Sequence, residues 1–474
     1  MTADHPAVAA IRAELGDVGV LTGDQAAPFL VDPRGVHVGS ALAVVRPAST
    51  AEVQAVVRTC GEHGVAIVPQ GGNTGLSGGT AVAADTPSVV VSLSRMNEIE
   101  AVDPHRWSMT VQAGVTIQAM HEAAAATDRM FAPDWGARGT ATIGGAIATD
   151  AGGNNVLRYG NLRDNVLGIE AVLADGRIWD GTRALRKDSS GYDLKQLFIG
   201  SEGTLGLVTR AVVRLHPPAT HEQSALAAIP GLDGLNDLYA LAQQTAPGMV
   251  TAFELIPEIG MQRVCEIYDV PRPIQTESAF YVLVKLGSTQ PVTDALGSFL
   301  ERAAEQGRIL DAVVAATADQ EERLWLIRDE LPPQRIFPDT QKVGLKMDTA
   351  VPVDRMAEYH DAVLGAAAEV VPDAIAYGFG HVGDGNLHVM ILPARPDDMD
   401  AFLALRPELE RRVDETTFAM GGTLSAEHGV GRHLRSRIQA QKPAVEWELM
   451  RSVKAVFDPD GIMNPGALLP AAEG

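Results

Sequence analysis

The amino-acid sequence predicts an α+β fold with two domains and a C-terminal segment. Strand-like and helix-like patterns alternate along the chain, and three glycine-rich segments all fall in its first half. The 474 residues allow two to four domains at roughly 100–200 residues each. The double proline after residue 216 is expected to end the first domain. We therefore expect domains over residues 1–218 and 219–421, followed by a partly helical segment over residues 422–474.

The first half of the chain is expected to contain short strands and helices in turn. Residues 50–63 have the pattern of a helix, because Ser49 or Thr50 can cap its N-terminus and its valines recur at helical spacing. An Asp-Gly turn predicts a hairpin between residues 166–173 and 177–179. The other expected elements are strands over residues 41–46, 65–69, 89–93, 109–113 and 207–215 and a helix over residues 117–126.

The second half is expected to form another α+β domain. Glycine is sparse between residues 219 and 371, where helical patterns such as residues 295–306 alternate with strands such as residues 280–285. No internal repeat interrupts this alternation. The remaining expected elements are strands over residues 374–379 and 389–392 and a helix over residues 444–457.

The chain is strongly acidic, which limits its partners. Its net charge is −22 and its isoelectric point is about 4.9. Such a surface repels nucleic-acid phosphates and anionic lipid headgroups, so no nucleic-acid partner is expected. The same charge repels an anionic substrate. A site for such a substrate must therefore supply its own cations.

Cysteine usage and the apolar runs restrict the class of protein further. Two cysteines, Cys60 and Cys265, exclude a disulfide framework and an iron–sulfur cluster held by this chain. One disulfide and two reduced thiols both stay open, and the thiols are favoured, as in a cytoplasmic protein. The N-terminus lacks the pattern of a signal peptide, and no run of about 18 apolar residues occurs, so no transmembrane helix is expected.

Three glycine-rich segments form the first candidate site. Residues 70–79 follow an expected strand and contain five glycines, whose backbone N–H groups can form a nest for a diphosphate. An ordinary flexible loop is the alternative for this segment alone. Residues 142–154 and 200–206 are also rich in small residues. Three such segments within about 140 residues favour one large cofactor touched at several places over a single dinucleotide-binding turn.

A pair of histidines forms the second candidate site. The dipeptide Asp384-Gly385 between them is a strong signal for a two-residue turn. With that turn, His381 lies directly opposite His388 on one face, with Cβ atoms about 4.5–5.5 Å apart. Two imidazoles at that separation can share one divalent metal. The alternative is two histidines that merely stack on neighbouring strands.

A Glu-His pair further along the chain can complete such a site. Glu427 offers a carboxylate as a third ligand, and His428 offers an imidazole beside it. Two histidines and one glutamate that leave coordination positions open are typical of a catalytic metal site rather than a structural one. The sequence therefore predicts a catalytic metal site.

These motifs resemble a known family over essentially the whole chain. VPQGGNTGLSGG, TIGGAIATDAGGNN, FIGSEGTLGLVT and NPGALL resemble the FAD-binding domain of the vanillyl-alcohol oxidase (PCMH) type. GHVGDGNLH and SAEHGVG resemble the D-2-hydroxyacid dehydrogenase branch of that family, which includes D-2-hydroxyglutarate and D-lactate dehydrogenases and glycolate oxidase subunits. The resemblance implies a PCMH-type FAD-binding domain, an α+β substrate (cap) domain and a C-terminal helical segment that closes the FAD site.

The resemblance also implies which residues bind FAD. The first segment would hold the pyrophosphate, and the later segments would line the flavin and the adenosine. Covalent members of the family carry a histidine in the first loop, where this chain has Asn73, so FAD is expected to be bound non-covalently. The residues carried over are Pro69, Gly71, Gly72, Asn73, Thr74, Gly75, Leu76, Ser77, Pro133, Thr142, Gly144, Gly145, Ala148, Thr149, Gly152, Asn154, Glu202, Gly203, Val208 and Asn464.

For the second site the resemblance implies metal-assisted oxidation of a D-2-hydroxy acid. His381, His388 and Glu427 would bind a divalent metal, expected to be zinc, which lowers the pKa of the substrate hydroxyl. His428 would bind the substrate and take the hydroxyl proton, since an imidazole ordinarily titrates near neutral pH. The α-hydrogen would leave as hydride to flavin N5.

Recognition of the substrate carboxylates is assigned to two cations. The resemblance to hydroxyglutarate enzymes implies Arg328 and Lys346. Two positions depart from the pattern of those enzymes, because Pro332 replaces an expected threonine and Met390 an expected asparagine. Both changes remove a hydrogen-bond donor. Beside the D-2-hydroxyglutarate class, the two departures therefore leave room for D-lactate or for an acid with a longer, less polar side chain.

The resemblance leaves the electron acceptor open. A dehydrogenase would pass electrons to a separate acceptor, namely an electron-transfer flavoprotein, a quinone or a cytochrome. An oxidase that uses O₂ directly is a second hypothesis. A glycolate oxidase-type flavoprotein subunit, catalytic or not, is a third, and a homodimer is compatible with each of them.

Overall fold

The computed structural model describes residues 5–33, 35, 38–82 and 86–469. Its contacts divide the chain into two compact units. The first consists of Met1–Gly153, Tyr159–Pro217 and Glu427–Gly474, and the second of Asn154–Arg158 and Pro218–Ala426. The division expected from the sequence, into residues 1–218, 219–421 and 422–474, stays a prediction.

A four-stranded sheet forms one part of the first unit. Its strand order is β1 (Val20–Leu21), β2 (Ala43–Val45), β4 (Ser88–Ser92) and β3 (Ala66–Gln70), with the last three parallel. Helices α1 (Pro6–Leu15) and α2 (Thr50–Glu62) bury their apolar faces in the same core. The Ser49 hydroxyl accepts a hydrogen bond from the Glu52 N–H and caps α2, as the sequence predicts.

A five-stranded antiparallel sheet forms the other part of the first unit. The order is β5 (Ile99–Asp103), β6 (Ser108–Gln112), β9 (Leu207–Arg214), β7 (Val166–Val172) and β8 (Ile178–Asp180), and the predicted hairpin β7–β8 is confirmed. The helices α3 (Ile117–Ala125) and α4 (Ile143–Thr149) supply core residues, and the end of α15 (Ala444–Phe457) packs against them. Short helices are α6 (Leu162–Asn165) and α7 (Lys195–Phe198).

Helix α4 was not expected, because it lies in a tract of small residues. Glycine disfavours a helix interior. Here, however, Gly144 must approach the preceding strand closely. A Cβ on Gly144 would lie 2.7 Å from the Cβ of Ala113, and its N–H donates a 2.8 Å hydrogen bond to the Ala113 carbonyl. Close packing against the sheet therefore overrides the local propensity.

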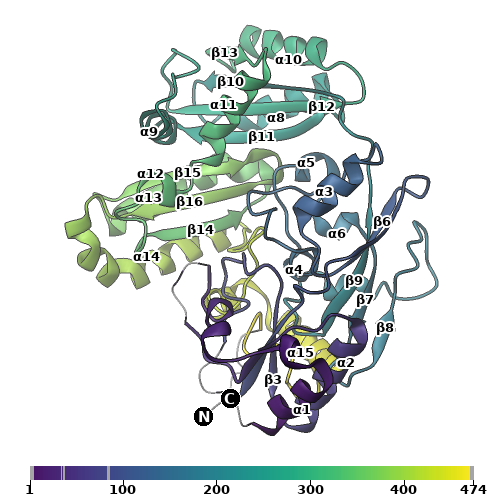
Figure 1. The fold of residues 1–474 in the computed structure, drawn as a ribbon. Coiled ribbons are helices and arrows are strands. Elements are labelled where there is room, and N and C mark those ends of the chain that lie inside the picture. Colours follow the sequence, from purple (N-terminus) through teal and green to yellow (C-terminus); the bar gives the residue numbers. More distant parts are fainter. Residues whose placement is uncertain (1–4, 34, 36–37, 83–85, 470–474) are drawn as a thin grey trace. The chain divides into compact units, whose positions relative to one another are not determined.

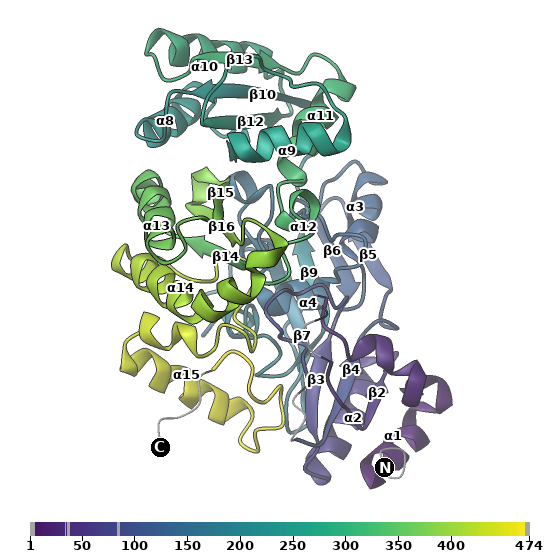
Figure 2. The same cartoon turned by 90° about the vertical axis from the view of Figure 1, so that its left-hand side faces the viewer.

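The second unit is built on a seven-stranded antiparallel sheet (Figures 1 and 2). All neighbouring strands in it run antiparallel. The order is β13 (Asp311–Val314), β10 (His221–Ile229), β12 (Phe280–Ser288), β11 (Val250–Pro257), β15 (Ile375–His381), β16 (Asn386–Leu392) and β14 (Leu345–Ala350).

Helices cover both faces of this sheet (Figure 2). One face packs on α9 (Glu258–Tyr268), α11 (Ala318–Asp329) and the short α12 (Pro333–Ile336), in a core that includes Tyr377 and Phe379 of β15. The opposite face packs on α8 (Leu235–Thr245) and α13 (Met356–Val370), since the ring of Tyr239 meets Phe253 and His360 lies against Gly378. Helices α10 (Thr293–Glu305) and α14 (Met399–Ala419) pack beside α8 and α13.

The hairpin β15–β16 corrects the register expected from the sequence. His388 pairs with Phe379, and not with His381. The connection has four residues instead of two, because Val382–Asp384 form a 3₁₀ turn and Gly385 follows in a left-handed conformation, with φ +76°. The change shifts the pairing by two residues, which keeps both histidines on one face. Their ring centroids lie 5.6 Å apart.

Two further expectations bear on the class of protein. Both cysteines are free, with Cys60 buried and Cys265 half-buried, as the sequence favours. In the described ranges of the chain, none of the helices combines the length and the hydropathy needed to cross a membrane.

Candidate active site

The second and third glycine-rich segments are joined by backbone hydrogen bonds in the first unit. The Gly200 N–H donates to the Ile147 carbonyl at 2.9 Å, and the Glu202 N–H donates to the Ala148 carbonyl at 2.7 Å. These carbonyls lie in the last turn of α4, where the helix itself offers no further N–H donors. The loop at residues 200–206 therefore caps the helix formed by the second segment.

Asn464 links the first segment to the third. Its side-chain amide donates to the Gly79 carbonyl at 3.0 Å and to the Glu202 carbonyl at 2.8 Å. Its oxygen accepts from the Arg432 guanidinium at 3.1 Å. Asn464 is buried and has φ +42°. The structure thus brings all three segments together, as expected for one large cofactor.

A cavity of about 470 Å³ lies beside the first segment, within the first unit. Gly71 and Gly72 lie so close to the neighbouring segment that no other residue would fit at these two positions. A Cβ on Gly71 would lie 2.4 Å from the Thr142 hydroxyl, and a Cβ on Gly72 would lie 1.9 Å from the Thr140 carbonyl oxygen. The cavity is lined by Pro28, Phe29, Gln70, Gly71, Gly72, Asn73, Ser92, Ser94, Asn97, Gly114, Val115, Thr116, Ala119, Gly139, Thr140 and Thr142.

Several lining residues were missed by the sequence motifs. Ser92 ends β4 and Ser94 follows it, while Gly114 to Thr116 follow β6. A usable signal did exist, because β3 and β4 are parallel neighbours and both end at this cavity. The carboxyl ends of parallel strands are the usual place for ligands in open sheets. Polar residues directly after the second strand were therefore candidates alongside the loop after the first.

The other expected cofactor residues lie along the same segments. Gly203 has φ +70°, and a Cβ on it would lie 2.3 Å from the Pro69 ring, so the third segment packs closely on β3. The Pro133 carbonyl contacts His121 Nε2 at 2.8 Å. Asn154 belongs to the second unit. The remaining residues are Thr74, Gly75, Leu76 and Ser77 in the first loop, Gly144, Gly145, Ala148 and Thr149 on α4, Gly152 just beyond it, and Val208 on β9.

The Glu202 side chain makes hydrogen bonds to the backbone of the protein. It is buried, and its carboxylate accepts from the N–H of Val430 at 2.7 Å and of Gly431 at 2.8 Å. Burial raises the pKa of the Glu202 carboxyl above its usual range, although these two N–H groups oppose the rise. Glu202 thereby fixes the segment that directly follows the Glu-His pair.

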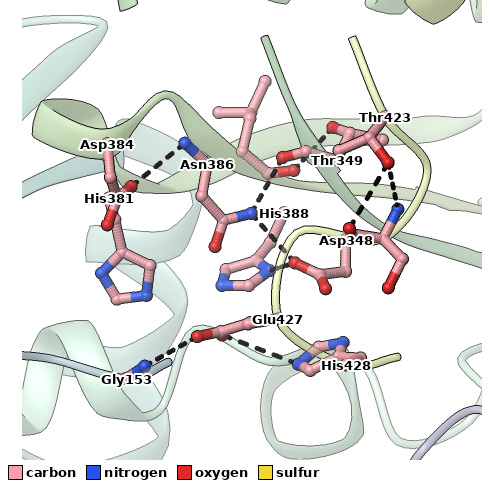
Figure 3. A network of polar contacts seen from close by, with 12 residues as sticks. Gly153, Asp348, Thr349, His381, Asp384, Asn386, His388, Thr423, Glu427 and His428 are labelled. Atoms are coloured by element: carbon pink, nitrogen blue, oxygen red, sulfur yellow. Dashed lines mark hydrogen bonds and ion pairs between the residues drawn. The ribbon is translucent and has the colours of Figure 1, made fainter. Parts of the chain in front are cut away.

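The Glu-His pair directly precedes this fixed segment (Figure 3). Glu427 accepts a 2.8 Å hydrogen bond from the Gly153 N–H, and His428 Nε2 lies 3.7 Å from the Glu427 carboxylate. The Ser77 hydroxyl donates to the His428 carbonyl at 3.1 Å. Gly431 has φ +53°, and a Cβ there would lie 1.9 Å from the Ser77 carbonyl oxygen. Only glycine fits at position 431, because the two backbone segments approach each other so closely.

In the second unit, one sheet face gathers the other polar candidates. Strand register pairs Glu254 with His381, Asp348 with His388 and Lys346 with Met390. Side chains alternate between faces with a period of two. These residues therefore share the face on which α9 and α11 pack.

His388 lies among polar side chains of the neighbouring strand (Figure 3). Its Nδ1 is 3.5 Å from the Asp348 carboxylate. That carboxylate also accepts a 2.9 Å hydrogen bond from the Asn386 amide, which donates to the Thr349 carbonyl as well. Both His388 and Asp348 are buried. Such a carboxylate on one ring nitrogen is the usual way to orient a metal-binding imidazole.

His381 is held on both sides of its ring. Its Nδ1 is 2.8 Å from one oxygen of Glu254, and its Nε2 is 3.1 Å from the Arg328 guanidinium. Arg328 Nε donates to the other oxygen of Glu254 at 3.0 Å. The Glu254 side chain is 1% exposed. Burial alone would raise the pKa of the Glu254 carboxyl, but His381 and Arg328 outweigh it and lower the pKa to about 2.

The second expected cation lies at the edge strand of the same sheet. Lys346 Nζ donates to the Gln341 side chain at 2.6 Å. Its cross-strand partner Met390 is buried in an apolar cluster with Tyr377. Pro332 directly precedes α12. The structure thus puts Arg328, at the end of helix α11, and Lys346, on β14, at one face of the sheet, where the apolar Met390 and Tyr377 also lie.

Two protein-family models match the chain. The model described as an FAD binding domain matches residues 41–182, and the model described as the C-terminal domain of FAD linked oxidases matches residues 219–468. The first match contains two of the glycine-rich segments. The second contains both histidines of the hairpin and the Glu-His pair.

Curated relatives match nearly the whole chain. The mitochondrial D-2-hydroxyglutarate dehydrogenase of Bos taurus is 36% identical and covers 91% of this chain and 77% of the relative. The D-2-hydroxyglutarate dehydrogenase of Stutzerimonas stutzeri is 36% identical, with 90% and 91% covered. The mitochondrial D-2-hydroxyglutarate dehydrogenase of Arabidopsis thaliana is 34% identical, with 91% and 76% covered.

Solved structures confirm the expected fold. A substrate-bound p-cresol methylhydroxylase has a TM-score of 0.75 at 17% identity and covers 97% of this chain and 95% of its own. A 4-ethylphenol oxidase of Gulosibacter chungangensis has a TM-score of 0.72 at 18% identity, with 98% and 97% covered. At such identities the likeness concerns the fold alone.

The chain belongs to the FAD-linked oxidase family, a class of flavin-dependent oxidoreductases. Within that class it is a member of the FAD-dependent D-2-hydroxyacid dehydrogenase branch, whose enzymes oxidise a CH–OH donor. The cavity in the first unit fits this cofactor. It is lined by glycine backbone, and the buried Thr142 hydroxyl finds no hydrogen-bond partner among the residues that the structure describes.

We expect Thr142→Val to weaken FAD binding by about fivefold without lowering the stability of the FAD-free protein. Among the described residues the hydroxyl has no partner to lose, whereas one neutral hydrogen bond to a ligand contributes about 1 kcal/mol. Flavin fluorescence during reconstitution gives the dissociation constant, and calorimetry gives Tm. Thr209→Val is the matched control, because that buried hydroxyl donates to Glu170 at 2.8 Å and its loss should lower Tm only. Unchanged FAD affinity in Thr142→Val would contradict the assignment.

Proposed function

We propose that the protein oxidises a D-2-hydroxy acid of the D-2-hydroxyglutarate or D-lactate class to the 2-oxo acid, by metal-assisted hydride transfer to N5 of FAD. One observation carries the proposal, namely the sheet face on which His381 and His388 lie with ring centroids 5.6 Å apart, beside the Arg328 cation. The relatives named D-2-hydroxyglutarate dehydrogenase support the substrate class. FAD supplies the hydride acceptor when it is bound.

We further propose that FAD is held non-covalently. Asn73 stands in the first loop, and its amide nitrogen donates to the Val31 carbonyl at 2.9 Å. Its oxygen accepts from the Thr80 hydroxyl at 2.9 Å. An amide engaged in this way is no nucleophile. The loop then contributes backbone N–H groups and a fixed shape rather than a bond to the flavin.

The proposed metal ligands are His381, His388 and Glu427. Further ligand-type atoms lie beside them within each unit, at Asp348 next to His388 and at His428 next to Glu427. The position of Glu427 in the sequence supports this set. Within the second unit the Ala426 N–H donates to the Asp348 carbonyl at 3.1 Å, and Glu427 is the next residue. A divalent metal, with zinc proposed, would polarise the hydroxyl and carboxylate of the substrate.

His428 is proposed as the base that takes the hydroxyl proton. Its main chain is fixed by the hydrogen bond from Ser77, and its Nε2 lies 3.7 Å from the Glu427 carboxylate. An imidazole held in place is the most frequent general base in enzymes. His428 is therefore suited to hold the proton while the α-hydrogen leaves as hydride.

Arg328 and Lys346 are proposed to bind the substrate carboxylates. In a chain of net charge −22, an anionic acid needs cationic partners at its binding site. Met390 and Pro332 offer no hydrogen-bond donor next to them, which keeps a monocarboxylate such as D-lactate open beside the dicarboxylate. We propose a separate electron acceptor. Direct use of O₂ and a role as a glycolate oxidase-type subunit are the alternatives.

We expect anaerobic mixing with D-2-hydroxyglutarate or D-lactate to bleach the visible absorption of the flavin, because hydride transfer reduces it. The corresponding L-acids are the control and should leave the flavin oxidised. A panel of D-2-hydroxy acids in which none bleaches the flavin would refute the proposed function. Admission of air then separates the acceptor classes, since rapid stoichiometric peroxide formation would favour the oxidase.

We expect His428→Ala to lower turnover by about 10²–10⁴-fold, the usual contribution of a general base. The FAD content should stay that of the wild type, because His428 is not among the residues assigned to FAD. His63→Ala is the control, since His63 is exposed and contacts only the Thr59 carbonyl among the interactions described. Turnover within a few-fold of the wild type in His428→Ala would exclude it as the base.

We expect chelation to remove activity and added Zn²⁺ to restore it. His381→Ala and His388→Ala should each lower the bound metal, measured by elemental analysis after gel filtration, together with turnover. Loss of one of three ligands weakens binding strongly at such sites. Full activity after complete chelation would rule out a role of the metal in the reaction.

A further inference from the structure

A buried carboxylate that the proposed reaction does not use lies at the centre of the histidine face. Glu254 is on β11, and its side chain is 1% exposed. Each of its two oxygens has one partner. One contacts His381 Nδ1 at 2.8 Å, and the other accepts from Arg328 Nε at 3.0 Å. A single carboxylate thus joins a proposed metal ligand to a proposed substrate-binding cation.

This arrangement is built into the sheet. Strands β11 and β15 pair so that Glu254 and His381 are direct cross-strand neighbours. Directly opposite residues have Cβ atoms about 4.5–5.5 Å apart and point to the same face. The contact therefore depends on strand register and not on the conformation of a loop.

The contacts also define which nitrogen of His381 carries the proton. Nε2 lies 3.1 Å from the Arg328 guanidinium, which can only donate. Nε2 must therefore accept, and it carries the lone pair. Nδ1 then carries the proton and donates it to Glu254. This is the tautomer in which Nε2 can bind a metal, since an imidazole coordinates through its unprotonated nitrogen. A metal bound there would take the place of the Arg328 contact.

We propose that Glu254 is a positioning residue: its carboxylate holds His381 as the Nδ1-protonated tautomer, so that Nε2 can coordinate a metal once its contact with Arg328 is displaced, and its other oxygen holds the Arg328 side chain. The proposal rests on the proposed function, because it takes His381 as a metal ligand. Glu254 itself touches neither the substrate nor the flavin in this role. It acts through the two residues that it binds.

Replacement by glutamine tests this, because the amide has one oxygen where the carboxylate has two. Its NH₂ group must face either Arg328, as donor against donor, or His381 Nδ1, which would move the ring proton to Nε2. We expect Glu254→Gln to weaken the binding of Zn²⁺ by about 10–100-fold, the usual effect of losing such a partner. Competition with a chromophoric chelator measures the affinity. The KM for the acid should rise as well, since Arg328 loses its anchor.

Glu258→Gln is the matched control. Glu258 begins α9 directly after β11 and pairs with Arg272 through two 2.8 Å contacts. It resembles Glu254 in binding one arginine but has no histidine partner among its described contacts. We expect Glu258→Gln to change stability while its affinity for Zn²⁺ stays within twofold of the wild type.

The failures of the two proposals are distinguishable. If His381→Ala binds Zn²⁺ as the wild type does, His381 is no ligand and the proposed function fails at this residue. If His381→Ala loses Zn²⁺ while Glu254→Gln keeps it, the role of Glu254 is overturned. Should Glu254→Gln fail to fold, ¹⁵N NMR of histidine-labelled wild-type protein decides. A signal of His381 protonated at Nδ1 supports the proposal, and protonation at Nε2 overturns it.

Discussion

Close approach of one backbone segment to another is the constraint on which both candidate sites depend. In the first unit, a Cβ at Gly72 would lie 1.9 Å from the Thr140 carbonyl oxygen, and a Cβ at Gly431 equally close to that of Ser77. In the second unit, a Cβ at Gly385 would lie 2.1 Å from the Val351 carbonyl oxygen. No other residue fits at such distances. The glycines therefore fix the cofactor cradle, the segment after the Glu-His pair and the turn between the histidines.

Within these backbone limits, each buried carboxylate is satisfied in a different way. Glu202 accepts from two backbone N–H groups, and burial still raises the pKa of its carboxyl. Glu254 has a histidine and an arginine as partners, and the pKa of its carboxyl falls to about 2. An unpaired buried charge would cost several kcal/mol. The first carboxylate orders a loop, whereas the second orders two side chains with chemical functions.

Local patterns were enough to predict most elements but not the pairings between them. The valine spacing and Ser49 predicted α2 within one residue of its end, because both signals lie inside the helix. The register predicted for the histidine hairpin was wrong. The sequence resembles a two-residue turn, but the 3₁₀ turn before Gly385 lengthens the connection. Asp348 and Glu254 carried no signal, because their partners come from strands far away in the sequence. The motifs locate the candidate side chains, whereas the strand register shows which side chains orient them.

The charge on the histidine face explains why a metal ion suits the proposed reaction. Arg328 and Lys346 bring two positive charges, while Glu254 and Asp348 bring two negative ones. Arg328 is already matched by Glu254 at 3.0 Å, so a substrate carboxylate at Arg328 would share a cation that is largely neutralised. These four side chains sum to zero before the anionic acid arrives. A divalent ion at neighbouring imidazoles supplies the missing positive charge and, unlike another lysine, also lowers the pKa of the hydroxyl to be oxidised.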